Sequence, residues 1–383
     1  MEQMKQTREP PLTGYLLNKA SRQHIPVTGT FELSPVCNFD CRMCYVHRTQ
    51  QEVEQHSRPM MKPEQWLELA RQAREEGLLY LLLTGGEPLL YPRFWELYEQ
   101  LYRMGFLLSI NTNGSMITPA VIERLRRMPP IRINITLYGA SNSTYQALCG
   151  ASGAFDRVDR AIMGLKQAGI QVKLNCSLTP YNVQDLEAMV RYAKERELIL
   201  DITAYMFPPL RRSPDMVGTN DRFTPEEAAL HTVRAYRLQH SPEEYRQYLE
   251  QLCRGIRPAP GLDESCVDPA DGRVRCRAGK AAFWITWDGY MTPCGMMPEP
   301  KTDLYGVDFS QAWRETTEKA AALSLSGLCR SCENRNICHA CAAMALTETG
   351  THAGVPRYLC RMIMAMKQTA EEALKNQIFA VTP

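Results

Sequence analysis

The stretch Leu78-Leu-Tyr-Leu-Leu-Leu-Thr84-Gly-Gly-Glu-Pro88 decides the fold class of this chain. A continuous apolar run that ends at a Gly-rich turn is typical of a strand buried on both faces, as in a parallel sheet. Before it, residues 62–77 have the pattern of an amphipathic helix, with Pro63 near the start and Gly77 as the stop. A helix that leads into a buried strand is part of a βαβ unit, so the stretch predicts an α/β protein with a parallel sheet.

The same alternation continues on both sides of this stretch. We expect strands at 31–33, 78–84, 106–112, 131–138, 170–178 and 198–206, and helices at 62–77, 92–104, 118–127, 154–168 and 182–196. Strands and helices that alternate at this pitch form successive βαβ units. The sequence therefore predicts a partial (β/α)6 parallel barrel, in which the chemistry lies at the carboxyl ends of the strands.

The alternation stops after Phe207, and this change divides the chain. We expect an N-terminal strap at 1–28, the barrel at 29–206, a helical connector at 207–260, and a small Cys-rich domain at 261–383 with a helix at 356–378. Within the last domain, residues 281–293 predict a β-hairpin that turns at Asp288-Gly289. The connector and its basic pair Arg211-Arg212 are either part of a substrate entrance or a solvated surface.

Composition and charge exclude several classes of protein. The 383 residues are 44% hydrophobic and 22% charged, which is ordinary for a globular protein. A net charge of +2 gives no reason to expect nucleic acid or a charged membrane as partner. The sequence has no run long enough to span a membrane and no signal peptide. We therefore expect a cytoplasmic protein, whose 14 cysteines serve metal or redox chemistry rather than disulfides.

Three of these cysteines lie in Cys37-Asn-Phe-Asp-Cys41-Arg-Met-Cys44, directly after the first predicted strand. The tight spacing makes their sulfurs converge. A structural zinc site normally has four protein ligands, and no Cys or His completes this set at the usual spacing, since His47 follows too closely. Three thiolates on a four-iron cubane would leave one iron open, and an open iron can hold a substrate or a cofactor.

The C-x3-C-x2-C pattern, with Gly85-Gly86-Glu87-Pro88 after the second strand, resembles radical S-adenosylmethionine (SAM) enzymes. The similarity continues through Ile135-Thr-Leu-Tyr-Gly139 and Gly153-Ala-Phe-Asp-Arg-Val158. The resemblance implies that Cys37, Cys41 and Cys44 are the catalytic centre and hold a [4Fe–4S] cluster whose open iron chelates SAM. One electron, from a donor such as flavodoxin or ferredoxin, would then release a 5′-deoxyadenosyl radical that abstracts hydrogen from the substrate.

The resemblance also implies further contacts with SAM. Gly85 and Gly86 would let the backbone approach the methionine moiety because no Cβ intervenes. Glu87 would offer its carboxylate to the ammonium group. The other implied contacts are Tyr45, Asn113, Thr136 and Arg157, and for Arg157 the alternative is a surface helix position.

A second set of cysteines resembles the SPASM extension of radical SAM enzymes. It includes Cys276, Cys294, the run Cys329-x2-Cys332-x5-Cys338-x2-Cys341, and Cys360. The resemblance implies two auxiliary [4Fe–4S] clusters, for three in total. One would take Cys276, Cys294 and Cys341 with Cys266 as a candidate fourth ligand; the other would take Cys329, Cys332, Cys338 and Cys360. The usual last spacing is three residues and here it is two, His339 and Ala340, which leaves the assignment of Cys341 open.

Two questions stay open for the cysteines. Paired C-x2-C motifs also suit zinc, so a pair of zinc sites is the alternative to the auxiliary clusters. Three cysteines have no place in either set, and buried inert thiols are the default for such residues: Cys149, Cys176 and Cys253.

For the function, the resemblance favours an oxidoreductase that matures peptides. Members of the SPASM group cross-link side chains, form thioethers, epimerise residues, or oxidise a Ser or Cys. The sulfatase-maturing members have Asp after the cysteine that matches Cys294, where this chain has Gly295, which argues against that activity. Residues 1–30 are too few for a leader-recognition domain of about a hundred residues. We therefore expect a precursor peptide that binds in the barrel directly or through a separate leader-recognition protein.

Two alternatives remain. One is a radical SAM enzyme that acts on a small molecule or a cofactor precursor. The other is a non-catalytic iron–sulfur electron carrier, which the intact three-cysteine motif disfavours because a carrier needs no open iron. For proton transfer, the sequence offers Tyr138, Tyr205 and Asp288 as candidates without geometric support.

Overall fold

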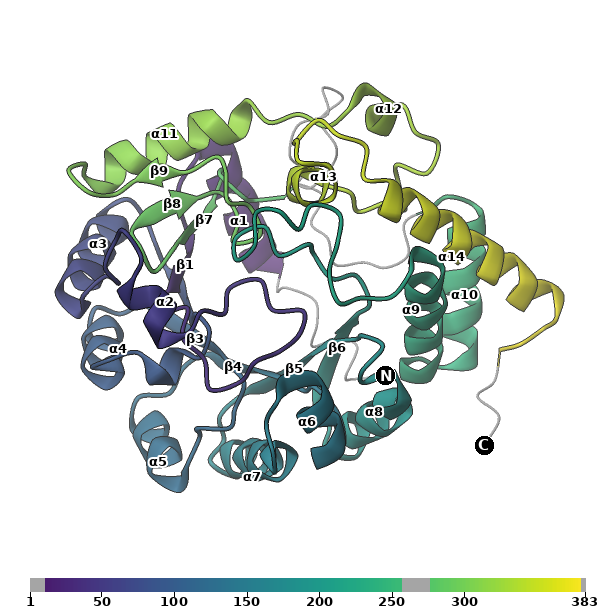
Figure 1. The fold of residues 1–383 in the computed structure, drawn as a ribbon, viewed down its shortest axis with the longest axis horizontal. Helices are drawn as coiled ribbons and strands as arrows, with labels where there is room; N and C mark the ends of the chain where they lie inside the picture. Colours follow the sequence, from purple (N-terminus) through teal and green to yellow (C-terminus); the bar gives the residue numbers. More distant parts are fainter. Residues whose placement is uncertain (1–10, 257–275, 380–383) are drawn as a thin grey trace.

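The computed structural model describes residues 11–256 and 276–379, and one curved sheet forms its centre (Figure 1). The sheet has nine strands in the order β6-β5-β4-β3-β2-β1-β7-β8-β9. The strands from β6 to β7 in this order pair in parallel, and β8 and β9 add antiparallel pairs at one edge. The predicted α/β class with six parallel barrel strands is confirmed.

The six barrel strands and the helices between them form where the alternation predicts them, with small shifts at their ends. The strands are β1 (Thr28–Glu32), β2 (Tyr80–Thr84), β3 (Leu107–Thr112), β4 (Arg132–Thr136), β5 (Val172–Ser177) and β6 (Ile199–Thr203). The predicted helices are α3 (Pro63–Glu75), α4 (Phe94–Arg103), α5 (Pro119–Arg127), α7 (Ala154–Gln167) and α8 (Leu186–Glu195). These helices lie on the outer face of the sheet (Figure 1).

The two faces of strand β2 have different surroundings. Leu81 and Leu83 are completely buried on the face that the helices cover. Their neighbours alternate with them because successive side chains of a strand point to opposite faces. Thr84, at the end of the strand, lines the interior of the barrel. The apolar run therefore packs against helices outside and builds the cavity wall inside.

Several short elements were not predicted. They are α1 (Pro11–Gln23), α2 (Gln50–Glu54), α6 (Asn142–Cys149), and the single turns η2 (Pro88–Leu90) and η3 (Val183–Asp185). The expected N-terminal strap thus contains a helix. The Nε1 of Trp313 on α11 donates to the carbonyl of His24, just after α1, at 2.6 Å. This bond ties the N-terminal segment to the C-terminal part of the chain.

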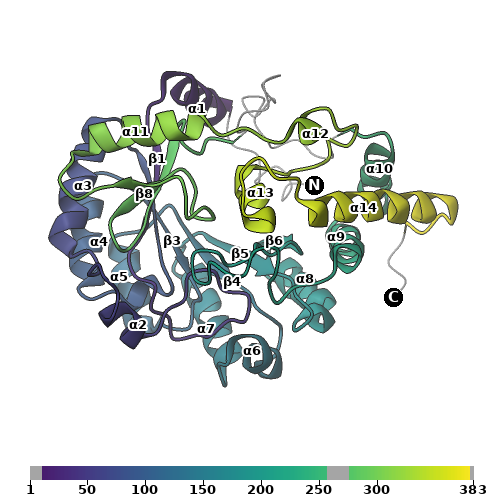
Figure 2. The same ribbon diagram turned by 45° about the horizontal axis from the view of Figure 1, so that its top comes forward.

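The later part of the chain extends the sheet and closes its open side. Its elements are α9 (Pro225–Gln239), α10 (Pro242–Cys253), β7 (Ala282–Ile285), β8 (Tyr290–Thr292), β9 (Thr302–Asp303), α11 (Phe309–Ala321), α12 (Gly327–Arg330), α13 (Ala342–Thr349) and α14 (Arg357–Lys375). The expected hairpin is β7–β8, and β7 pairs in parallel with β1. Figures 1 and 2 show α13 between the two ends of the curved sheet, while α14 packs against α9 and α10. The expected boundary near residue 260 lies outside the described residues and stays a prediction.

Two buried ion pairs connect these segments. Arg211, after β6, donates both terminal nitrogens to Glu32 at the end of β1, at 2.7 and 2.6 Å. Arg222 pairs with Glu348 on α13 at 2.6 and 3.0 Å. The Tyr205 hydroxyl also donates to Glu348, at 2.7 Å. Because bidentate Arg–carboxylate pairs are geometrically specific, they fix the C-terminal elements over the barrel mouth.

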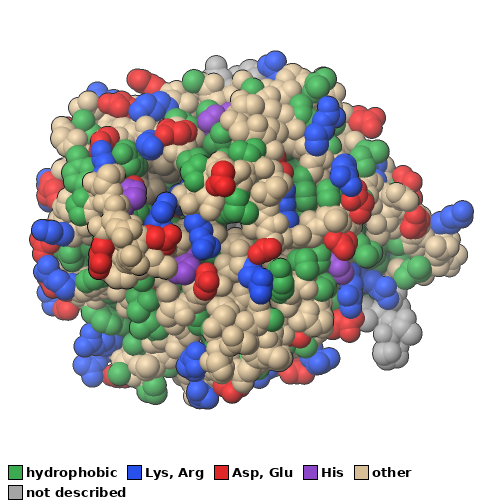
Figure 3. Space-filling model, viewed as in Figure 1, with side chains coloured by type: hydrophobic (Ala, Val, Ile, Leu, Met, Phe, Trp, Pro, Cys, Tyr) green, Lys and Arg blue, Asp and Glu red, His purple; other side chains and the backbone are tan. Residues whose placement is uncertain are grey.

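Two surface features agree with the sequence. The face in Figure 3 carries acidic and basic side chains interspersed rather than in a patch of one sign. Among the described helices, none combines the length and the apolar character needed to cross a membrane.

Candidate active site

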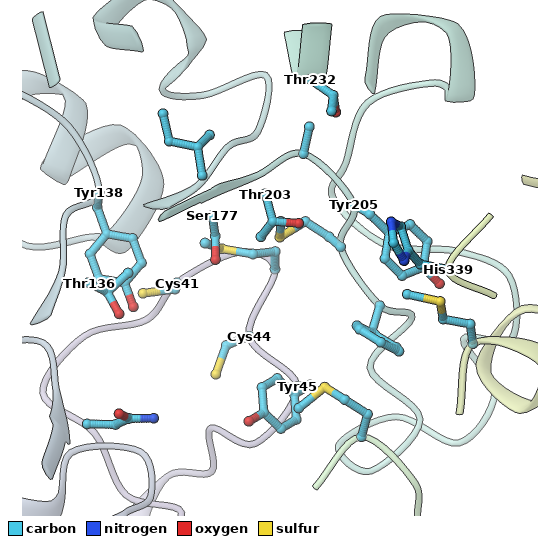
Figure 4. A pocket seen from close by; sticks show the side chains of 18 of the residues that line it. Cys41, Cys44, Tyr45, Thr136, Tyr138, Ser177, Thr203, Tyr205, Thr232 and His339 are labelled. Carbon is cyan, nitrogen blue, oxygen red and sulfur yellow. The ribbon is translucent and has the colours of Figure 1, made fainter. Parts of the chain in front are cut away.

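A cavity of about 600 Å³ lies at the carboxyl ends of the barrel strands, where the topology predicts the chemistry (Figure 4). Residues at or after five successive strand ends contribute to its wall: Thr84, Thr112, Thr136, Ser177 and Thr203. The Cys37–Cys44 loop forms one side, and residues of α10, α13 and α14 form the opposite side. Side chains from distant parts of the sequence therefore enclose one space.

The three motif cysteines all line this cavity. Burial raises the pKa of Cys37 to about 12 and that of Cys44 to about 11, so both thiols are protonated at neutral pH until a metal displaces the proton. Cys41 and Cys44 both interact electrostatically with Cys37. Three thiols on the wall of one cavity match in number the ligands of a four-iron cubane that keeps one iron open.

Asn113 lies where the sequence predicts it and contacts the cysteine loop. Its Nδ2 donates to the Cys37 sulfur at 3.7 Å and to Asn38 Oδ1 at 2.9 Å. Thr136 and Tyr45 also lie on the cavity wall (Figure 4). These three residues surround the place where a ligand of the cluster would lie.

Gly85 and Gly86 line the cavity, and the structure gives a further reason for the two glycines. A Cβ on Gly85 would lie 2.3 Å from the carbonyl oxygen of Ser34. A Cβ on Gly86 would lie 2.5 Å from the carbonyl oxygen of Val36. The glycines thus let the turn after β2 pass against the backbone that leads to Cys37, whatever they do for a ligand.

Glu87, the expected partner of the SAM ammonium group, is held inside the protein by its own hydrogen bonds. Its side chain is completely buried and lies behind the cavity wall. The carboxylate accepts hydrogen bonds from Thr112 Oγ1 at 2.8 Å and from the backbone N–H groups of Asn113 and Leu89 at 2.9 and 3.2 Å. Loss of hydration raises the pKa of Glu87 to about 7. Glu87 is therefore tied to the end of β3 by its bonds with Thr112 and Asn113, and its contact with SAM stays a prediction.

Arg157 is also not brought to the site. It is exposed on α7, and its Nη1 donates to the carbonyl of Ser152 at 3.1 Å. The alternative of a surface helix residue describes this position, and a contact of Arg157 with the cofactor stays a prediction.

The first auxiliary set is brought together by the hairpin and α13. Burial raises the pKa of Cys294 to about 12, and the neighbouring thiols of Cys276 and Cys341 add to this shift. Cys341 is the residue just before α13 and also interacts with Cys276. Cys266, the candidate fourth ligand, lies outside the described residues.

The second auxiliary set is also brought together, closer to the surface. Burial raises the pKa values of Cys329, Cys338 and Cys360, and the thiols interact with one another and with Cys332. Cys332 is exposed, whereas Cys338 lines the cavity. The electrostatic interactions among these thiols fall within the two groups that the resemblance implies, and the auxiliary clusters stay a prediction.

Arg211 corrects the expectation of a basic entrance loop. Its side chain is 10% exposed and lies between the two cysteine regions. Besides Glu32, its Nη1 donates to the carbonyl of Gly295, next to Cys294, at 2.9 Å. Its guanidinium carbon is 5.9 Å from the ring centre of Tyr45, next to Cys44. Arg211 is therefore a buried connection between the regions and not a surface charge.

Sequence reasoning missed the wall that faces the cluster loop. It is built mostly from apolar side chains, among them Met206, Leu252, Met344, Leu359, Met362, Ile363 and Met366. On α14 these residues recur at helical spacing, a pattern that from sequence alone indicates ordinary core packing. No Lys or Arg of the described residues lines the cavity. The wall is thus suited to an uncharged part of a substrate.

Three comparisons with known proteins find chains similar to this one in sequence or in fold. The model of the radical SAM superfamily matches residues 31–193. The AdoMet-dependent heme synthase of Methanosarcina barkeri is 26% identical over 291 residues, which cover 72% of this chain and 80% of that protein. The mycofactocin maturase MftC of Mycobacterium tuberculosis is 30% identical over 181 residues, 46% of this chain and 44% of that one. The structure of Streptococcus suis SuiB bound to its precursor peptide SuiA superposes with a TM-score of 0.65 at 16% identity, covering 90% of this chain and 79% of that one.

Proposed function

Because the chain belongs to the radical SAM superfamily, we propose that it abstracts a hydrogen atom from a peptide and thereby starts a post-translational modification. The observation that carries this proposal is the cavity wall, which joins the three motif cysteines to an apolar surface without a described Lys or Arg. A [4Fe–4S] cluster with bound SAM supplies the 5′-deoxyadenosyl radical for this step.

Each part of the wall has a distinct task in this proposal. Cys37, Cys41 and Cys44 hold the cluster, and Asn113 orients the loop through its contact with the Cys37 sulfur. Thr136 and Tyr45 bound the space for SAM. The apolar side chains of α14 exclude water, which protects a carbon radical from side reactions.

The auxiliary sets would hold two further [4Fe–4S] clusters. Cys276, Cys294 and Cys341, with Cys266 as the candidate fourth ligand, would hold one, and Cys329, Cys332, Cys338 and Cys360 the other. Cys338 lies on the cavity wall, so the second set is placed to accept an electron from a substrate radical. An external electron carrier such as flavodoxin or ferredoxin would reduce the first cluster.

The absence of Lys and Arg from the described wall, where His339 is the ionisable nitrogen base, favours a peptide over a charged metabolite. Phosphates and carboxylates that are bound in a protein usually pair with Arg or Lys. A peptide can instead insert one uncharged side chain and leave its charged parts outside. Its leader would be bound elsewhere, by the chain itself or by a separate recognition protein.

Among peptide modifications, the sulfatase type has the least support. A Cβ on Gly295 would lie 2.6 Å from the ring of Trp284, so this position cannot take the Asp of that group unless Trp284 moves. Trp284 is held in turn by its Nε1, which donates to Glu32 at 2.9 Å. Cross-linking, thioether formation, epimerisation and other oxidations remain within the proposal.

A second candidate has its own support. The heme synthase relative spans most of both chains, which favours a small-molecule or cofactor precursor as substrate. A tetrapyrrole is large and apolar, as the cavity wall is, but its carboxylates would need cations that the described wall lacks.

One experiment separates the two candidates. The loaded, reduced enzyme is incubated with SAM in D2O and either a synthetic peptide encoded beside the gene or an iron porphyrin that bears carboxylates. We expect the peptide to lose hydrogen or, if it is epimerised, to gain deuterium by mass spectrometry, while the Cys37→Ala enzyme leaves it unchanged. A changed porphyrin beside an unchanged peptide would overturn the peptide proposal.

A further inference from the structure

We propose that Asn111 and Asn134 form a pair of amide side chains on the barrel side of the cavity that recognises an uncharged oxygen of the bound ligand. Asn111 donates the hydrogen bond through its Nδ2, and Asn134 is a positioning residue that fixes the Asn111 amide. The oxygen is a hydroxyl or a carbonyl, and it belongs either to SAM or to the substrate. The inference applies to a peptide and to a small-molecule substrate alike, so it does not depend on the proposed function.

The two amides meet on neighbouring strands of the barrel. Asn111 on β3 and Asn134 on β4 are partners in the parallel register of the sheet. Asn134 Nδ2 donates a hydrogen bond to Asn111 Oδ1 at 2.7 Å. Asn111 lines the cavity, and so does Thr136 (Figure 4), which lies two residues after Asn134 and therefore on the same face of β4. Both amides thus face the interior of the barrel.

The hydrogen bond between the two amides determines what Asn111 offers to a ligand. A side-chain amide has one oxygen, which accepts, and one nitrogen with two hydrogens, which donates. The amide is planar, so when the oxygen of Asn111 turns to Asn134, its nitrogen turns away from Asn134. Because Oδ1 is already bonded, Nδ2 is the atom of Asn111 that remains for a ligand in the cavity.

The burial of Asn134 indicates that the pair serves more than the fold. Its side chain is 9% exposed, and its Oδ1 is buried without a hydrogen-bond partner in the part of the chain that the structure describes. Such an oxygen costs folding free energy, because it loses water and gains no donor. Branched apolar side chains normally fill the interior of a parallel barrel and carry no such cost. An Asn at this place is explained if its other polar atom, Nδ2, is needed to orient Asn111.

The rest of the barrel side of the cavity indicates an uncharged partner for the Asn111 donor. The side chains at the strand ends are neutral hydroxyls: Thr84, Thr112, Thr136, Ser177 and Thr203. No Lys or Arg of the described residues lines the cavity, whereas bound carboxylates and phosphates usually pair with such cations. A neutral N–H donor among hydroxyls suits a hydroxyl or carbonyl oxygen instead. The sugar of SAM carries hydroxyls and a peptide carries carbonyls, so both offer such an oxygen.

The test measures SAM binding and substrate kinetics separately in the reconstituted enzyme. Cleavage needs an electron, so anaerobic calorimetry of the oxidised enzyme gives the affinity for SAM without turnover. The KM is measured with whichever candidate substrate, peptide or porphyrin, the wild type consumes. We expect Asn111→Ala and Asn111→Asp to weaken one of these two quantities by roughly three- to tenfold, because a neutral hydrogen bond is lost. Asn111→Asp keeps the acceptor for Asn134 and nearly the same shape, but it has no N–H to donate.

A second set of variants tests the positioning role of Asn134. Asn134→Ala should weaken the same quantity by about two- to threefold, because the Asn111 donor stays but is no longer oriented. In the Asn111→Ala background it should add nothing, whereas a purely structural role would give the same loss in both backgrounds. Asn175→Ala is the matched control and should change neither quantity. Asn175 is the next amide along the barrel, the partner of Thr136 on β5, and does not line the cavity.

The two measurements distinguish the possible outcomes. A weaker affinity for SAM assigns the oxygen to SAM, and a raised KM at constant SAM affinity assigns it to the substrate. If both Asn111 variants bind SAM and substrate as Asn175→Ala does, the proposal is overturned. If Asn111→Ala does not fold, Asn111→Asp decides. If the wild type consumes neither candidate substrate, the proposed function fails, and the affinity for SAM alone decides this inference.

Discussion

The two cysteine regions differ in enclosure and in the number of ligands, and the difference indicates separate tasks. The barrel set has three motif thiols around an enclosed cavity, and Cys41 is 6% exposed. The second auxiliary set has four thiols on short loops and helix ends, and Cys332 is exposed. An incomplete ligand set inside a cavity suits binding and bond cleavage, whereas a complete set near the surface suits electron transfer.

Removal of the barrel set should have the largest effect. We expect about twelve irons per reconstituted chain, and about eight after replacement of Cys37, Cys41 and Cys44 by Ala. Cleavage of SAM should be abolished, because the open iron is lost with its ligands. Iron analysis and chromatography of 5′-deoxyadenosine measure both quantities, with Cys176→Ala as the control. If the triple variant still cleaves SAM, the barrel cysteines are not the site of cleavage, and the proposed difference in task between the two cysteine regions is wrong.

Removal of the second auxiliary set should give the opposite pattern. Cys329→Ala with Cys360→Ala should again lose about four irons. Cleavage of SAM without substrate should stay within about threefold of the wild-type rate, because the open iron is intact. Modification of the peptide should fall at least about tenfold, since the electron acceptor is missing. If this variant loses SAM cleavage and peptide modification to the same extent, the two cysteine regions do not have separate functions.

The contrast between the regions also shows what a sequence can predict. The six strands and the three-cysteine loop follow from short-range pattern and spacing, whereas the grouping of the seven later cysteines came from the resemblance to a known family. The pairing of β7 with β1 does not follow from such patterns, because it joins residues that are far apart in the chain. The burial of Arg211 also could not be predicted from short-range patterns, since its partner Glu32 comes from the first strand.

The direction in which a side chain points is the other feature that the sequence did not predict. Glu87 has the expected position at a strand end, but it is completely buried and its carboxylate accepts a hydrogen bond from Thr112. Cys149 has no spacing relation to the motif and meets it only because α6 ends beside Cys41. Local patterns thus predict which element carries a residue, while the packing of several elements decides where its side chain points.

The ion pair between Arg222 and Glu348 tests whether the two regions are held as one unit. Glu348→Ala would leave a buried guanidinium without its partner, which costs about 3–5 kcal/mol. The apparent melting temperature of the loaded enzyme should fall by several degrees in thermal unfolding. Glu226→Ala is a matched control, since it removes an exposed pair with Arg361 between α9 and α14 and should change little. If both variants shift the melting temperature equally, the buried pair between Arg222 and Glu348 does not stabilise the protein more than an exposed pair does.

The smallest expected effect concerns Glu87, which is bonded to the end of β3 in the barrel and not to the auxiliary cysteines. Its pKa rises from 4.5 to about 7 on folding, so the folded protein holds the proton more tightly than the unfolded chain does. Its contribution to stability is complete below pH 4.5 and is lost as the pH rises through 7, by about 3 kcal/mol in total. Glu87→Gln cannot ionise, so it does not lose stability in this way as the pH rises. We therefore expect the melting temperature of Glu87→Gln minus that of the wild type to increase between pH 5.5 and 7.5. Glu318→Gln, exposed on α11, should show no such trend. A constant difference between Glu87→Gln and wild type would contradict a pKa near 7 for Glu87 in the folded protein.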